Sequence, residues 1–294
     1  MHSYLRAVGF SKLNSQSELD KLIEMILESP LQRKVALSDQ GTKFAEITKS
    51  FSDNMGIALR GEYDESGKFH LENYYPYYYG DTVSTKEEIL FNKKVDSESY
   101  TGMCDDIRIG VSLIFYLQNI LNFMEVKKQK EKLEQCMAVN LSGLSLEGKI
   151  ILGLEKQEKT HKDKLYEATH RNQLIAEARR GNQEAIDSLT IDDIDLYAMI
   201  TKRAKYEDVY TIVESSFVPF GSESDNYSVI GTILDIKILE NEFTKEEVYA
   251  LLLESNDLRF YVCINKMDLQ GEPQVGRRFK GVIWMQGTVD FNQV

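Results

Sequence analysis

The amino-acid sequence predicts an α+β protein with a largely antiparallel N-terminal sheet, a helical segment and a small β-rich C-terminal domain. Between about residues 33 and 100, apolar and polar residues alternate with the period of two that strands show. Near residue 155 the composition shifts to helix-forming residues, and beyond residue 222 strand-like runs return. We therefore expect domains at 1–154 and 222–294, with a helical segment at 155–216 packing on the first.

The first element is expected to be an amphipathic helix in "SQSELDKLIEMILESP", residues 15–30. Apolar residues recur there at helical spacing, namely Leu19, Leu22, Ile23, Ile26 and Leu27. Ser15 and Glu18 have the spacing of a capping box, and Pro30 should end the helix.

The following strands are predicted from "TKFAEITKSF", "MGIALRGEY", "KFHLENYYPYYYG" and "EEILFNKKV", with "YDESGKF" as a hairpin turn. Together they predict an antiparallel sheet. Strand and helix periodicities coexist over 107–124, so the sequence does not locate the switch between them. "CMAVNLSGLSLEGKIILGLE" is interpreted as one more hairpin.

The C-terminal part is expected to follow a linker in "FVPFGSESDNY", residues 217–227. A helix is predicted in "TKEEVYALLLES", capped by Thr244, between strands that include "LRFYVCINKM" and "RRFKGVIWMQGTVDF". This order of elements is compatible with an OB-like barrel.

Charge and composition narrow the classes of partner. The chain of 294 residues has a net charge of -12, and both its parts are acidic, which disfavours nucleic acid. The N-terminal residues contain no apolar run of a secretory signal, and the most apolar window carries polar residues, so we expect a cytoplasmic protein without a membrane span. Its three cysteines lie far apart in the sequence, and we expect no metal site and no cofactor.

One motif suggests a GTPase. Asn265, Lys266 and Asp268 match the guanine-binding pattern, and Gly143 and Lys149 fit the spacing of a phosphate-binding loop. However, Ile150 stands where Ser or Thr must hold magnesium, and a turn and a strand, rather than a helix, are expected after Asp268. We interpret the motif as polar residues that open a turn after a buried strand.

Two surfaces are candidates for binding a ligand or partner. If residues 277–287 are extended, Arg278, Lys280, Trp284 and Gln286 share one face, which would suit an anionic or aromatic ligand and which we expect to be open to solvent or to a partner. The tyrosines of "NYYPYYYG", Tyr75, Tyr77 and Tyr79 among them, suit an interface. The alternative for both is structural, with Trp284 and alternate tyrosines packed in the core.

Three stretches, "MHSYLRAVGFSKL", "HRNQLIAEARRGNQEAIDSLT" and "GEPQVGRRFKGVIWMQG", resemble a family of unknown function from clostridia and related Gram-positive anaerobes. The resemblance covers most of the chain and implies a cytosolic protein of about this length. It implies no catalytic residue.

The sequence thus favours a non-catalytic binding or regulatory protein that contacts an unknown protein or small-molecule partner. Two alternatives stay open: a hydrolase or transferase with scattered acid-base residues, and single-stranded nucleic-acid binding through the C-terminal β domain. Homo-oligomerisation also stays open.

Overall fold

The structure is a computed structural model that describes residues 2–38, 41–93, 98–106, 108–129, 137–153, 170, 173–174, 176–178, 180–191, 194 and 213–291. It divides into two compact units. The first comprises residues 1–151 and 215–294, and the second comprises residues 152–214.

The N-terminal segment forms a short 3-10 helix, η1 (Ser3–Val8), and the predicted helix, α1 (Gln16–Glu28). The capping box is confirmed, because the Ser15 hydroxyl accepts from the Glu18 N–H while the Glu18 carboxylate accepts from the Ser15 N–H. One face of α1 buries Leu19, Leu22 and Ile26, as its apolar spacing predicts.

An antiparallel sheet is present as four strands in the order β1-β2-β3-β4, and three of them, β2 to β4, lie where the sequence predicts strands. The strand predicted in "EEILFNKKV" pairs instead in the other sheet. Its strands are β1 (Gln32–Leu37), β2 (Lys43–Ser52), β3 (Met55–Tyr63) and β4 (Phe69–Tyr78). The turn between β3 and β4 lies where the sequence predicts it, closed by a hydrogen bond from the Asp64 N–H to the Lys68 carbonyl.

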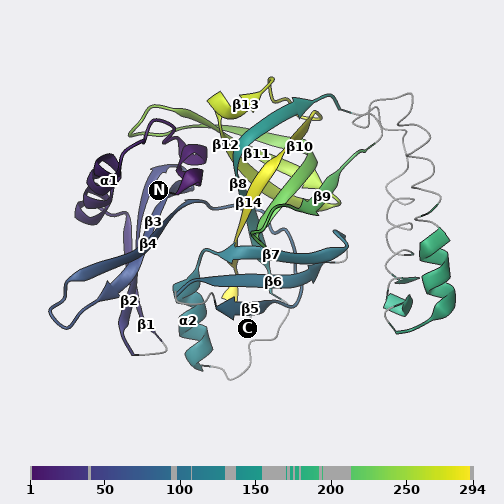
Figure 1. Ribbon diagram of the computed structural model, residues 1–294, viewed down its shortest axis with the longest axis horizontal. Helices are drawn as coiled ribbons and strands as arrows, with labels where there is room; N and C mark the ends of the chain where they lie inside the picture. The colour runs from purple at the N-terminus through teal and green to yellow at the C-terminus, as the bar shows by residue number, and fades with distance from the viewer. Residues whose placement is uncertain are drawn as a thin grey trace. The chain divides into compact units, whose positions relative to one another are not determined.

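A closed five-stranded barrel forms the other main part of the first unit (Figure 1). Its strands are β8 (Val139–Ile151), β10 (Asn226–Glu240), β11 (Glu247–Ser255), β12 (Leu258–Asn265) and β14 (Arg278–Val289). Neighbouring strands pair antiparallel except β8 and β12, which are parallel, and pairing of β14 with β8 closes the ring. Hence β8, expected within the first domain, pairs with strands of the segment expected to form the third.

Further strands extend the barrel sheet. β5 (Leu90–Lys93), β6 (Tyr100–Asp106) and β7 (Val111–Leu117) continue from β14, while β9 (Ser216–Pro219) pairs with β10 and β13 (Leu269–Gln270) with β8. The helix α2 (Ile120–Gln129) begins soon after β7, which locates the switch that periodicity left open. Because β9 and the start of β10 overlap residues 217–227, that segment is partly paired strand and not simply a linker.

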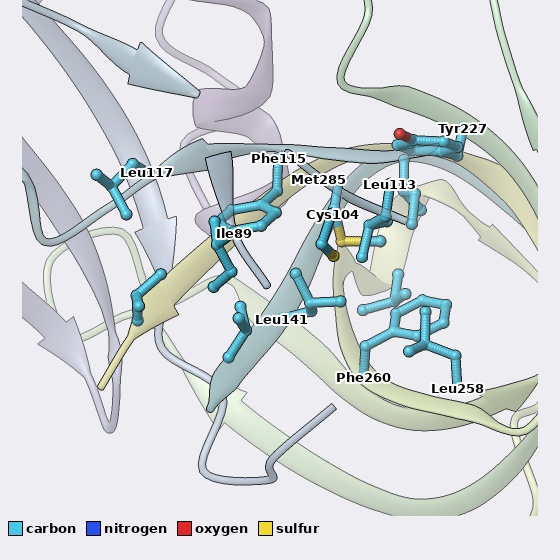
Figure 2. Packing of buried hydrophobic residues seen from close by; sticks show 14 of the residues in the cluster. Ile89, Cys104, Leu113, Phe115, Leu117, Leu141, Tyr227, Leu258, Phe260 and Met285 are labelled. Atoms are coloured by element: carbon cyan, nitrogen blue, oxygen red, sulfur yellow. The ribbon is translucent and has the colours of Figure 1, made fainter. Parts of the chain in front are cut away.

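Two hydrophobic clusters fill the first unit. One lies inside the barrel and continues along β6, β7 and α2, which contribute residues to it. Figure 2 shows Leu113, Leu141, Phe260 and Met285 within this cluster. The other lies between the outer surface of the barrel, the four-stranded sheet and the N-terminal helices, and includes Ile57 and Tyr261. Several barrel strands therefore have both faces buried.

The helix predicted over residues 244–255 is wrong, because this segment is the strand β11. Tyr249, Leu251 and Leu253 belong to the first cluster, while Val248 and Ala250 belong to the second. A strand with two buried faces has a continuous apolar run instead of an alternating one, and such a run resembles a buried helix.

The hairpin predicted over residues 136–155 is also wrong, since Val139–Ile151 is one strand. Its glycines resemble turn signals, but they mark close packing instead. A Cβ at Gly143 would lie 2.9 Å from the Ile283 side chain, and one at Gly148 would lie 2.3 Å from Phe279.

The second unit is described only in part. Residues 176–178 and 183–191 are helical, and Gly181 adopts a φ of 84° between them. The Asn182 side chain accepts hydrogen bonds from the N–H groups of Glu184 and Ala185, as expected of a residue that begins a helix. Most of the helical segment predicted over 155–216 lies outside the described residues.

Candidate functional site

The face of β14 expected to be open is mostly buried, so that expectation is wrong. Arg278, Trp284 and Gln286 are 3%, 7% and 0% exposed, and Lys280 is half-buried. The opposite face, with Phe279, Ile283 and Met285, points into the barrel as expected. The outer face is covered because the second hydrophobic cluster packs against it, while both edges of β14 pair with β10 and β8.

Trp284 lies in a group of aromatic rings. Its ring centroid is 4.9 Å from that of His2, 5.4 Å from that of Tyr4 and 5.2 Å from that of Tyr116. Its indole Nε1 donates to Asp225 Oδ2 over 3.1 Å. Both the ring and the N–H of Trp284 thus have partners inside the protein.

The tyrosines of β4, and Tyr79 directly after it, are also largely internal. Tyr75 and Tyr77 are each 2% exposed, and Tyr79 is half-buried and stacks on Tyr77 with 4.3 Å between ring centroids. Burial raises the pKa of Tyr75 well above its ordinary value. Tyr75 and Tyr77 therefore fit the structural alternative. They lie at alternate positions of β4, so both face the second hydrophobic cluster.

Arg60 in β3 connects these predicted residues, although the sequence analysis did not single it out. Its guanidinium is fully buried, and Nε donates to Glu46 Oε2 over 2.7 Å. The other nitrogens donate to the hydroxyls of Tyr75 and Tyr116 and to the carbonyls of Leu117 and Gln118. An arginine inside the apolar run "MGIALRGEY" is the signal that could have indicated this network.

The network continues to β14. Gln118 Nε2 donates to Gln286 Oε1 over 2.8 Å, and Gln286 Nε2 donates to the Pro76 carbonyl. The structure therefore brings together Tyr75, Gln286 and, through Tyr116, Trp284. It does so in a buried network that joins the four-stranded sheet to β7 and β14, and not on an open binding surface.

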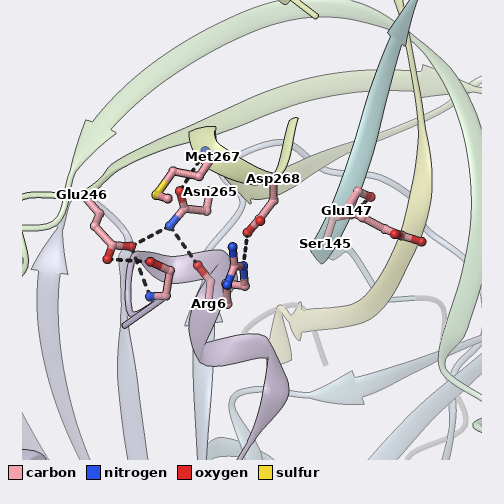
Figure 3. A network of polar contacts seen from close by, with 8 residues as sticks. Arg6, Ser145, Glu147, Glu246, Asn265, Met267 and Asp268 are labelled. Atoms are coloured by element: carbon pink, nitrogen blue, oxygen red, sulfur yellow. Dashed lines mark hydrogen bonds and ion pairs between the residues drawn. The ribbon is translucent and has the colours of Figure 1, made fainter. Parts of the chain in front are cut away.

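The residues of the GTPase-like motif form a capped turn, as interpreted from the sequence. Asn265 precedes the 3-10 helix η2 (Lys266–Asp268), and its side-chain oxygen accepts from the Met267 N–H. Figure 3 shows Asn265 Nδ2 donating to Glu246 and to the Arg6 carbonyl, and Arg6 paired with Asp268. These groups fasten the turn to η1.

We expect no magnesium-dependent binding of GTP. The Asn265 amide is buried and already bonded, and Gly143, Gly148 and Lys149 lie in the extended strand β8, where they form no loop around a phosphate. Isothermal titration calorimetry with GTP and Mg²⁺ checks this. Saturable heat at micromolar GTP would contradict it.

A pocket of about 370 Å³ lies near the capped turn at Asn265, and we call it the α1 pocket. Its lining residue Glu246 accepts a hydrogen bond from Asn265 Nδ2. Residues after η1, the first turns of α1 and the turn between β10 and β11 line it. Its apolar lining comes from Phe10, Leu13, Leu22 and Phe243. Phe243 is 62% exposed, and its ring centroid is 6.2 Å from that of Phe10. This volume falls within the range of small-ligand sites, which begins at about 300 Å³.

Hydrogen bonds between distant parts of the chain hold the walls of the α1 pocket. Asn241 is fully buried and donates to the Val8 carbonyl over 2.8 Å, while its side-chain oxygen accepts from the N–H groups of Phe243 and Thr244. The Thr244 hydroxyl donates to the Gly9 carbonyl over 2.6 Å. The turn that carries Phe243 is therefore fixed against η1 before any ligand binds.

The polar lining of the α1 pocket contains two carboxylates and two ammonium groups. Glu246 accepts from the Ser11 N–H, the Ser11 hydroxyl and Asn265 Nδ2. Hydrogen bonds from Asn14 and Ser15 lower the pKa of Glu18 below its ordinary value, and the charge of Lys21 adds to the effect.

The two lysines of the pocket differ from its carboxylates. Within the described ranges, neither Lys12 Nζ nor Lys21 Nζ makes a hydrogen bond or an ion pair within 4.0 Å, and both residues are exposed. The carboxylates are thus engaged by the protein itself, whereas the ammonium groups face the solvent.

Gly9 is required where η1 meets the turn between β10 and β11. It has a φ of 87°, and a Cβ there would lie 2.8 Å from the Cβ of Asn241. We expect Gly9→Ala to lower the free energy of unfolding by about 1–3 kcal/mol, measured by urea denaturation. Gly67→Ala is the matched control, because Gly67 has a φ of 82° and nothing within 4 Å. An equal loss in both variants would show that contact with Asn241 is unimportant.

Among the described residues, no group of three or more His, Cys, Asp or Glu side chains is placed to hold a metal ion. In the same part of the chain, none of the helices has both the length and the apolar character needed to cross a bilayer. The prediction that the protein has no cofactor stays a prediction.

Comparison with known proteins gives one match. A family model described as "Domain of unknown function, E. rectale Gene description (DUF3881)" matches residues 5–287. This confirms the resemblance to a family of unknown function drawn from the three sequence stretches. No curated protein and no solved structure matches the chain significantly.

Proposed function

Since the chain belongs to this family of domains of unknown function, we propose that it is a non-catalytic binding protein of the cytosol whose small ligand occupies the α1 pocket. The observation that carries the proposal is a preformed apolar hollow with the exposed aromatic ring of Phe243 at its edge. Exposed aromatic side chains beside a concave apolar surface are typical of binding sites.

The described cysteines do not offer a nucleophilic thiol. Cys104 and Cys263 are both buried, and burial raises the pKa of Cys104 to about 12 and that of Cys263 further still. The thiolate is the nucleophilic form, and it is scarcely populated at neutral pH when the pKa is this high. Neither thiol is therefore prepared for covalent catalysis.

A second candidate is single-strand nucleic-acid binding through the barrel. Its closed ring of five strands with one parallel pair favours an OB-like description, in which β8 would stand for the last strand of that fold. Against this candidate, Arg278 and Trp284 are buried, and the net charge of -12 repels phosphates. Saturable binding of a labelled oligothymidine in a filter assay would favour it over the α1 pocket.

The proposed function is tested with the uncharged dye N-phenylnaphthylamine, whose fluorescence rises in apolar surroundings. We expect saturable binding at one site and a loss of about tenfold in affinity in Phe243→Ala, because about 1.4 kcal/mol of apolar contact is removed. Phe220→Ala is the matched control, since Phe220 is 50% exposed and does not line the α1 pocket. The absence of saturable binding, or an equal loss in both variants, would contradict the proposal.

A further inference from the structure

The charges around the α1 pocket indicate the chemistry of its ligand. Glu246 already accepts three hydrogen bonds, and Glu18 accepts two from the backbone at the start of α1. A cationic ligand would have to compete with these donors for the carboxylate oxygens. An anionic ligand meets less competition, because Lys12 and Lys21 have no hydrogen-bonded or ion-pair partner within the described residues, and the charge of Glu18 acts on Lys21 from beyond 4.0 Å.

The apolar lining indicates the rest of the ligand. Phe10 and Leu22 are each 4% exposed, and the ring centroid of Phe243, in the turn between β10 and β11, lies 6.2 Å from that of Phe10. A hydrocarbon chain on these side chains would gain about 25 cal/mol for each Å² of apolar surface removed from water. A volume of about 370 Å³ suits a short chain, and it is too small for a folded domain.

We propose that the α1 pocket binds a short-chain amphipathic carboxylate, with its hydrocarbon tail on Phe10, Leu22 and Phe243 and its carboxylate at Lys12 and Lys21. This inference rests on the proposed function, since it names the ligand class of the same pocket. Lys12 follows η1 and Lys21 lies in α1, so a carboxylate between them would be positioned by two ammonium groups and not by one. The fixed walls reduce the entropy lost when the ligand binds.

The experiment compares octanoate, octanol and octylammonium by isothermal titration calorimetry. These three probes share one tail and differ in head-group charge. We expect octanoate to bind the wild-type protein about tenfold more tightly than octanol, and octylammonium to bind most weakly. Raising the ionic strength should weaken octanoate binding and leave octanol binding unchanged.

Charge variants separate the head-group contact from the tail contact. Lys12→Gln/Lys21→Gln should lower octanoate affinity about tenfold and leave octanol affinity unchanged. Lys34→Gln/Lys68→Gln removes the same charge from exposed lysines that do not line the pocket, and it should retain octanoate affinity. All four lysines are exposed, so the variants should keep the urea midpoint of the wild type.

The outcomes distinguish the ligand class from the pocket itself. If octanol binds as tightly as octanoate, or if the control variant loses as much affinity as the pocket variant, carboxylate recognition is wrong while the pocket remains a binding site. Tightest binding of octylammonium would likewise overturn it. If N-phenylnaphthylamine binds and octanoate does not, only this inference fails. Failure of both probes removes the proposed function as well.

Discussion

Arg60→Met is expected to lower the free energy of unfolding by about 3–5 kcal/mol. The substitution removes the guanidinium that neutralises Glu46, and it leaves that carboxylate buried at 7% exposure. It also removes the Arg60 donor to the hydroxyls of Tyr75 and Tyr116 and one of the two donors to the carbonyl of Gln118. Chemical denaturation in urea, fitted for both the midpoint and its slope, measures the loss.

The double variant Arg60→Met/Glu46→Met is the control for this prediction. Removing both charges ends the penalty of an unpaired buried carboxylate, so the double variant should be more stable than Arg60→Met by at least about 1 kcal/mol. It should not regain full stability, because the Gln118 carbonyl and two tyrosine hydroxyls still lose a donor. A single variant within about 1 kcal/mol of the wild type would show that the network is not a main source of stability.

The elements that the sequence predicted well are determined by neighbouring residues. Ser15 and Glu18 cap α1 through bonds within one turn, and the turn at Asn265 forms through a bond to the Met267 N–H two residues away. Such contacts require no knowledge of the rest of the fold. Local spacing therefore predicts them correctly.

The wrong predictions arise where distant packing decides the structure. In β11 the apolar run reflects two cores on opposite faces, and in β8 the glycines reflect the side chains of Ile283 and Phe279 across the strand. Neither partner can be identified from the local sequence. A buried apolar segment of this length is ambiguous between helix and strand until its neighbours are known.

The candidate site depends even more on distant contacts. The α1 pocket exists because Asn241 bonds to Val8 and Thr244 bonds to Gly9, pairs separated by 233 and 235 residues in the sequence. Phe243 beside Asn241 is a local signal, because an aromatic residue within a polar turn is a candidate for an exposed binding surface. The sequence singles out Trp284 because it is the only tryptophan and lies close to Arg278 and Lys280. Neither property predicts whether its side chain is buried.

Trp284→Ala is expected to destabilise the protein by about 3–5 kcal/mol, because it opens a cavity among the rings of His2, Tyr4 and Tyr116. It also leaves the buried Asp225 carboxylate without its indole donor. Trp284→Phe retains most of the ring contact and should cost less, about 1–3 kcal/mol. Urea midpoints of the two variants test this order. A wild-type midpoint for Trp284→Ala, together with loss of a bound partner, would restore the binding role expected from the sequence and contradict the packing role that the structure gives it.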